Sequence, residues 1–187
     1  MSASPFKFVA MSGSLRKGSY NSAILRAAQK LAPADATIEI VEIGHLPFYN
    51  EDLRPGTGFP DVVQAFRDKL AAADAILFAV PEYNYSVTAV LKNAIDWASR
   101  APNQPVAGKP YAMISVSGGT LGGSRGQLQL RQIMVSCDCV AINNPQVFIG
   151  GAKDKFDADL NYTDKTGQDL VRQLLEKAVS LGRQLKK

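Results

Sequence analysis

The chain of 187 residues has few of the residues that build metal sites and disulfide frameworks. It contains two cysteines, Cys137 and Cys139, and a single histidine, His45. A structural zinc site needs about four Cys or His ligands, so we expect no tightly bound transition metal. The C-x-C spacing disfavours a disulfide between alternate positions of one strand, and we therefore expect two buried, reduced thiols.

Long apolar runs and dense clusters of charge are also missing. The longest apolar run, residues 71–81, is interrupted by Asp74 and falls short of the roughly 20 residues that span a bilayer. The first apolar run lacks the pattern of a secretory signal, so we expect a cytoplasmic protein without membrane insertion. The net charge of +4 suits nucleotide phosphates or other small anions, but it is too diffuse to indicate nucleic-acid binding.

What the sequence does contain is the composition and pattern of an α/β protein. Its length suits one domain over residues 1–187. A composition of 46% hydrophobic and 20% charged residues excludes a disordered chain. Apolar periodicity predicts helices and strands in alternation. Strands are expected over 6–12, 37–43, 75–80 and 111–116, with an irregular fifth within 140–149; helices are expected over 20–31, 61–73, 87–100, 127–137 and 168–185.

The alternation predicts a doubly wound parallel sheet with right-handed crossovers and helices on both faces. The second helix is expected to be capped by Asp61 and to bury an apolar stripe that includes Val63, Phe66 and Leu70. In sheets of this kind ligands bind beyond the carboxyl ends of the strands. The loops that follow the strands are therefore the place to look for function.

The first of these loops, residues 12–21, combines hydroxyls, backbone N–H groups and Arg16 at the start of a helix, where a phosphate could bind. Gly13 and Gly18 have the spacing of a Walker A loop, but Ser19 stands where that motif requires lysine. The G-x-G-x-x-G fingerprint is absent too, so a nucleotide triphosphatase and an ordinary Rossmann dehydrogenase are both disfavoured. The alternative is a solvated turn in which Ser19 caps the helix.

Two further loops add aromatic and glycine residues. Residues 81–86, Pro-Glu-Tyr-Asn-Tyr-Ser, suit a planar heterocycle, or equally a proline-initiated turn whose tyrosines pack on the next helix. The glycines of residues 117–125 allow a ligand to approach the backbone, although such loops also occur as plain turns. Because a parallel sheet brings successive strand ends to one edge, we expect the three loops to lie together.

Four motifs carry a family resemblance: Gly-Ser-Leu-Arg-x-Gly-Ser-x-Asn at 13–21, Pro-Glu-Tyr-Asn-x-Ser at 81–86, Leu-Lys-Asn-Ala-Ile-Asp-Trp at 91–97 and Ser-x-Gly-x-x-Gly-Gly-x-Arg at 117–125. Together they resemble the NADPH-dependent FMN reductase family, and within it the bacterial quinone reductases also described as chromate reductases. The resemblance implies a flavodoxin-like fold with five parallel strands in the order 2-1-3-4-5. It also implies non-covalently bound FMN, with NADPH or NADH as the electron donor.

Carried over by position, the resemblance implies two groups of FMN-binding residues. Those around the phosphate would be Ser14, Leu15, Arg16, Ser19, Tyr20 and Asn21, and those around the ring would be Pro81, Glu82, Tyr83, Asn84, Ser117, Gly118 and Gly119. The chain departs from the family at Thr88 and Ala89, where relatives often have Pro-Gly. In such enzymes the flavin performs the redox chemistry, so no catalytic side chain is expected; Glu82 is the nearest ionisable group, and its expected role is structural.

Two arginines are candidates for contact with substrate. Arg100 and Arg125 could attract the phosphates of NADPH or an anionic acceptor, although each could instead be a helix-end charge or part of a subunit-interface ion pair. His45 and Asp96 have no visible partners, and we expect structural roles for both.

The expected activity is reduction of quinones and, with low specificity, of other acceptors including chromate, by a ping-pong mechanism. A homodimer or homotetramer is also implied, with Tyr83, Tyr85 and Trp97 as candidate subunit contacts. The alternatives are a flavodoxin-type electron carrier, a flavin-binding redox sensor, or a relative that reduces azo or nitro compounds. Such a carrier is usually strongly acidic, so the charge of +4 favours the enzyme.

Overall fold

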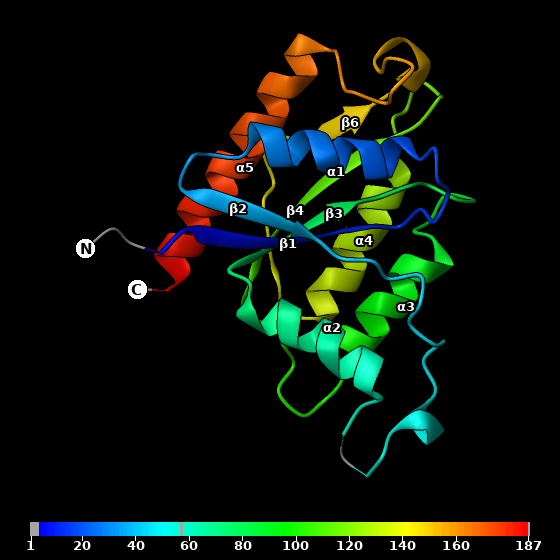
Figure 1. Ribbon diagram of the computed structural model, residues 1–187, viewed down its shortest axis with the longest axis vertical. Coiled ribbons are helices and arrows are strands. Elements are labelled where there is room, and N and C mark those ends of the chain that lie inside the picture. Colours follow the sequence, from blue (N-terminus) through cyan, green and yellow to red (C-terminus); the bar gives the residue numbers. More distant parts are fainter. Residues whose placement is uncertain (1–3, 57, 187) are drawn as a thin grey trace.

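The computed structural model describes residues 4–56 and 58–186, which form a parallel sheet between two helical layers (Figure 1). The strands are β1 (Phe6–Ser12), β2 (Ala36–Ile40), β3 (Ala75–Ala79), β4 (Pro110–Val116), β5 (Val140–Ala141) and β6 (Val147–Ile149). The helices are α1 (Tyr20–Leu31), α2 (Asp61–Ala72), α3 (Ala89–Ala98), α4 (Ser124–Ser136) and α5 (Lys165–Leu185), with two short 3₁₀ turns at Glu51–Leu53 and Ala152–Asp154.

All strand pairs are parallel, and the order β2-β1-β3-β4-β5 confirms the predicted 2-1-3-4-5 topology. The fifth position differs from a single strand because two short strands share it. β5 pairs with the beginning of β4, and β6 pairs with its end. Pro145 lies between them and lacks the N–H group that a continuous ladder would use. The irregularity expected within 140–149 is thus a break in the strand.

Side chains from the two faces of the sheet enter two separate cores. Phe8, Ala10 and Leu77 pack beneath α1 and α5, whereas their neighbours Val9 and Phe78 pack beneath α2, α3 and α4. This division follows from the alternation of side chains along a strand. All residues of β3 and β4 are buried, as expected for strands covered on both faces. The two cores fix the strands so that their carboxyl ends share one edge of the sheet.

The helix boundaries correct several sequence-based expectations. Asp61 does not cap α2: Pro60 holds the cap position, no side chain bonds there, and Asp61 is the first helical residue. α4 begins at Ser124 instead of residue 127, because Gly123 adopts a left-handed conformation with φ 82° and lets the helix start directly after the glycine loop. α3 is shorter than expected at both ends, and α5 begins three residues earlier, at Lys165.

Both cysteines are free thiols near the end of α4. Cys137 is buried, as expected, whereas Cys139 is only half-buried. Burial raises the pKa of Cys139 to about 12, and its thiol donates to the carbonyl of Val106 at 3.1 Å. In the part of the chain that the structure describes, no three His, Cys, Asp or Glu side chains gather as metal ligands would. Across the same residues, no helix has the length and apolar character needed to cross a membrane.

Candidate active site at the carboxyl edge of the sheet

Hydrogen bonds join the three loops that follow β1, β3 and β4, as the sequence predicted. The amide of Gly13 donates to the carbonyl of Ala79 at the end of β3 (3.0 Å). Asn21, at the beginning of α1, bonds the end of β4 twice: its Nδ2 donates to Val116 O (2.9 Å), and its Oδ1 accepts from Val116 N (3.1 Å). The side chain of Asn21 is buried and holds the first and third loops together.

The loop after β1 offers a set of donors that suits a phosphate monoester. Among the described residues, the four consecutive amides of residues 15–18 donate to no acceptor of the chain. Arg16 is exposed, and its guanidinium donates to the carbonyl of Gly18 (2.9 Å), which folds the side chain along the loop. The first turn of α1 carries no acidic residue that would repel an anion. Free amides, a guanidinium and a helix N-terminus together fit the phosphate of FMN.

Ser19 is the helix cap that the alternative interpretation of this loop proposed. Its side chain is buried, and its Oγ accepts from the amide of Ser22 (3.2 Å). Tyr20, the first helical residue, packs its ring on Phe156 with the centroids 5.0 Å apart. The capping role of Ser19 is compatible with phosphate binding by this loop, because the four free amides precede Ser19.

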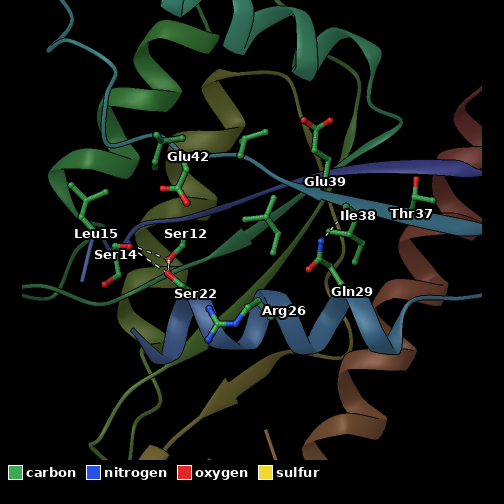
Figure 2. A pocket seen from close by; sticks show the side chains of 13 residues that line it. Ser12, Ser14, Leu15, Ser22, Arg26, Gln29, Thr37, Ile38, Glu39 and Glu42 are labelled. Atoms are coloured by element: carbon green, nitrogen blue, oxygen red, sulfur yellow. Dashed lines mark hydrogen bonds between the residues drawn. The ribbon is translucent and has the colours of Figure 1, made fainter. Parts of the chain in front are cut away.

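Figure 2 shows the hydrogen bonds that join the loop after β1 to the first turn of α1. The hydroxyl of Ser22 donates to Ser12 Oγ (3.1 Å), which also accepts from the amide of Ser14 (3.2 Å). A cavity of about 720 Å³ opens beside these serines, between α1 and β2. It includes Ser14 and Leu15 but none of the predicted ring-binding residues, so it lies on the β2 side of the loop. At its rim, Gln29 Nε2 donates to the carbonyl of Ile38 in β2 (2.9 Å).

The loop after β3 ends in a tight two-residue turn. Tyr83 and Ser86 exchange backbone hydrogen bonds of 2.9 and 3.0 Å, and Asn84 and Tyr85 between them have φ angles of 50° and 67°. Two positive φ angles define a type I′ turn, whose second central position is usually glycine. Asparagine tolerates this conformation, but a left-handed tyrosine costs about 1–2 kcal/mol. Tyr83 and Tyr85 remain 58% and 66% exposed, so they do not pack against α3 as the alternative interpretation required.

Glu82 has the structural role that was expected of it. One carboxylate oxygen accepts from the amides of Arg125 (3.0 Å) and Gly126 (3.3 Å), in the first turn of α4. Gly123, at the cap of that helix, supplies no side-chain bond, so Glu82 satisfies these amides from another loop. Its other oxygen pairs with the guanidinium of Arg125 (3.4 Å).

The loop after β4 leaves open space beside Gly118. A Cβ atom built on Gly118 would meet no atom within 4 Å, so a planar ligand can approach this backbone. Ser117 is held in place by its amide, which donates to Ile149 O in β6 (2.9 Å), and by its hydroxyl, which donates to Gly119 O (3.2 Å). The backbone here is thus fixed while its outer surface stays accessible.

Comparison with known proteins decides the family. The sequence model of the NADPH-dependent FMN reductase family matches residues 6–154. The chain belongs to this family. A Pseudomonas aeruginosa relative named NAD(P)H-dependent FMN reductase is 49% identical over 170 residues, which cover 91% of both chains. A Solanum tuberosum relative named NAD(P)H:quinone oxidoreductase is 47% identical over 192 residues, which cover 100% of this chain and 98% of the relative.

A solved structure agrees with this assignment. The flavoenzyme NAD(P)H:(acceptor) oxidoreductase of Paracoccus denitrificans matches with a TM-score of 0.86 and 32% identity, over 96% of this chain and 98% of that one. The predicted family, its flavodoxin-like fold and its cofactors FMN and NAD(P)H are confirmed.

Thr88 has a structural role that was not expected from the sequence. Its hydroxyl donates to the carbonyl of Gly13 (2.7 Å) and accepts from the amide of Leu91 (3.4 Å), so it caps α3 and joins the first two loops. The loops lie so close that a Cβ atom on Gly13 would sit 2.7 Å from Thr88 Oγ1 and 2.8 Å from Pro81 Cδ. A threonine three residues before Leu91 is a helix-cap signal that the sequence did offer.

The structure places Arg100 at the end of α3 that lies away from the three loops. Arg100 follows α3, a helix of ten residues and therefore about 15 Å long, at the end opposite Thr88. Its guanidinium group donates to the carbonyl of Asp96 (3.1 Å) and to Ser99 Oγ (3.1 Å). Arg100 therefore fits the alternative role of a charge at the end of a helix.

Two further expectations about α3 were wrong. Trp97 is fully buried and donates from Nε1 to Pro47 O (2.7 Å), so it is not available as a subunit contact. Asp96 does have a partner, Lys92, at 2.7 Å.

His45 is exposed on the connection between β2 and α2.

Proposed function

We propose that the protein is an FMN-dependent NAD(P)H:quinone oxidoreductase. The observation that carries the proposal is the joining, at one edge of the sheet, of a phosphate-binding loop to an exposed aromatic turn. The loop supplies the free amides of residues 15–18 and Arg16, and the turn supplies Tyr83 and Asn84. The names of the Pseudomonas and Solanum relatives support the same activity.

The cofactor part of the proposal can be tested on purified protein. We expect a yellow protein that releases FMN on acid denaturation, identified by chromatography. Apoprotein should also recover its absorbance spectrum on titration with FMN. Recovery of FAD alone, or failure of the apoprotein to bind FMN, would overturn the proposal.

The chain contributes binding and orientation to this reaction. Bound FMN would supply the redox chemistry, which is hydride transfer from NAD(P)H and delivery of two electrons to the acceptor. The amides of residues 15–18 and Arg16 would hold its phosphate, and residues 81–84 with Ser117, Gly118 and Gly119 would line its ring. Glu82 is engaged at the start of α4, and no side chain is assigned as a general acid or base.

We propose that donor and acceptor use the same exposed ring face in turn, so the mechanism is ping-pong. Double-reciprocal plots at several NADPH concentrations should then be parallel, and excess quinone should compete with NADPH. Intersecting plots, with a ternary complex trapped in binding experiments, would contradict the single-face mechanism.

Quinone should be a better acceptor than chromate. A quinone is planar and can stack beside Tyr83, whereas chromate is tetrahedral and would depend on a free cation. The candidate cations are already engaged, Arg125 by Glu82 and Arg100 at the end of α3. Steady-state oxidation of NADPH with and without each acceptor separates these outcomes. A holoprotein that oxidises NADPH with neither would instead be an electron carrier or a redox sensor.

We also propose that the protein is a homodimer or homotetramer. Large apolar side chains remain exposed on the turn and on α4: Tyr83 (58%), Tyr85 (66%), Leu128 (57%) and Val135 (77%). Exposed apolar groups of this size often mark protein contacts. Light scattering that shows a stable, fully active monomer would contradict this prediction.

A further inference from the structure

The type I′ turn of residues 83–86 adopts a conformation that its own sequence does not favour. Neither central residue is glycine, and Tyr85 has a φ of 67°. Within the turn, the exchanged backbone bonds between Tyr83 and Ser86 oppose its relaxation. Tyrosine in this conformation needs support from the surrounding structure.

That support comes from Arg125 in the first turn of α4. Its guanidinium carbon lies 4.1 Å from the centre of the Tyr85 ring, a cation–π contact. The same group pairs with Glu82 at 3.4 Å, and the backbone of Arg125 donates to the other oxygen of Glu82 at 3.0 Å. Glu82 directly precedes the turn and Tyr85 is one of its two central residues, so Arg125 bridges the base of the turn and its tip.

The base of this bridge is also closely packed. A Cβ atom on Gly126 would lie 3.3 Å from the Cα of Glu82, so α4 begins directly against the base of the turn. The side chain of Glu82 is 15% exposed and that of Arg125 is 40% exposed. The half-buried Glu82 therefore anchors an arginine whose outer end reaches the ring of Tyr85.

We propose that Arg125 is a positioning residue that holds this turn in its left-handed conformation and so presents Tyr83 and Asn84 as a fixed surface to planar acceptors. The inference rests on the proposed function. It also replaces the expectation that Arg125 binds an anion, because Glu82 already neutralises its charge. Acceptors that must stack need the fixed turn, whereas a non-stacking acceptor such as ferricyanide does not.

The first test compares Arg125→Ala with Arg125→Lys and with Arg131→Ala, another arginine of α4, which bonds Asn143 instead of the turn. For Arg125→Ala we expect KM for 1,4-benzoquinone to rise about three- to fivefold, the size of effect typical of one partly exposed cation–π contact. Turnover with ferricyanide should stay within about twofold of the wild type, since its reduction needs no stacking. Arg125→Lys should recover part of the loss, and Arg131→Ala should match the wild type.

A second-site variant tests whether Arg125 acts through Tyr85, because Tyr85→Gly removes both the ring that Arg125 contacts and the backbone strain. Glycine adopts a positive φ freely, so a Tyr85→Gly turn no longer needs support. In the Tyr85→Gly background, Arg125→Ala should therefore change KM for benzoquinone by less than about 1.5-fold. Equal effects of Arg125→Ala in both backgrounds would overturn the proposal.

Amide hydrogen exchange tests the turn independently of activity. The amide of Ser86 donates to Tyr83 O (3.0 Å), so its exchange reports opening of the turn. Arg125→Ala should speed this exchange about three- to fivefold and leave the amides of β3 unchanged. If the wild type reduces neither acceptor, the proposed function fails while this measurement still decides the role of Arg125.

Four further results would overturn the role assigned to Arg125. These are unchanged Ser86 exchange in Arg125→Ala, an equal loss with benzoquinone and ferricyanide, a rise in KM for NADPH alone, and dissociation of the oligomer in light scattering. The third would show a contact with the donor, and the fourth would show a subunit contact.

Discussion

Replacing Thr88 with valine tests the hydrogen bond that links the loop after β1 to the loop after β3. Valine has nearly the same shape, so the change removes the hydroxyl and leaves no large cavity. The hydroxyl donates to Gly13 O at 2.7 Å in a site where Thr88 is 3% exposed, so water cannot replace it there. An unsatisfied buried carbonyl costs about 1–3 kcal/mol. The lost helix cap adds about 0.5 kcal/mol, at the low end of its range because the bond from Leu91 is long (3.4 Å).

Thr88→Val should therefore lower the free energy of unfolding by about 2–3 kcal/mol, measured by urea denaturation as a shift of the midpoint without a change in slope. Thr88→Ser keeps the hydroxyl and should lose about 1 kcal/mol or less, the value of one buried methyl group. Thr163→Val, at an exposed threonine, is the matched control for the same chemical change.

The same variant should bind FMN more weakly, because the two loops are no longer held in register before the cofactor arrives. Ordering them on binding costs about 1 kcal/mol, so the dissociation constant should rise about fivefold in a fluorescence titration. A loss of stability below about 0.5 kcal/mol, equal to that of Thr163→Val, would refute the assigned role of this hydroxyl.

Three further predictions concern single side chains. Arg16→Ala should weaken FMN binding by about 1.5–3 kcal/mol, as expected for one charge-assisted bond, and unchanged affinity in a titration would remove Arg16 from the site. Burial raises the pKa of the Asp74 carboxyl, but the hydrogen bonds from Lys186 and from the amide of Lys7 outweigh it and hold this pKa below its usual value. A lowered pKa stabilises the fold above the unfolded pKa of about 4 and is lost as pH falls through the lowered value. Asp74→Asn should thus cost about 1–2 kcal/mol at pH 7 and progressively less as pH falls through the lowered pKa in denaturation experiments, and a constant difference would contradict this. Because burial raises the pKa of Cys139 to about 12, iodoacetamide should label it at pH 7 far more slowly in native than in unfolded protein, and equal rates would contradict its burial.

The sequence predicted the sheet well because buried parallel strands leave continuous apolar runs. The runs at 6–12 and 75–80 fall on β1 and β3 within one residue. It also predicted which loops would meet, since topology alone brings strand ends to one edge. The helix ends were less certain because they depend on the conformation of one residue, such as the left-handed Gly123 before α4.

The sequence could not predict contacts between residues that are distant along the chain. Thr88 bonds a carbonyl 75 positions away, and Glu82 satisfies the first turn of a helix 43 positions away. Contacts across such separations leave no periodic pattern in the sequence from which they could be predicted. The left-handed Tyr85 was equally hidden, because tyrosine is rare at that position of a turn and its support lies in another element.

The contact between Gln29 and β2 has a consequence for how copies of this protein can meet. β2 is an edge strand of the sheet. An edge strand has unpaired backbone groups with which a strand of another molecule can pair. Gln29 occupies the carbonyl of Ile38 in the middle of that strand, and Glu39 beside it is paired with Lys69 at 2.7 Å. An incoming strand would have to displace the amide of Gln29 before it could bond there. One side chain thus makes the pairing of a foreign strand along this edge of the sheet less favourable.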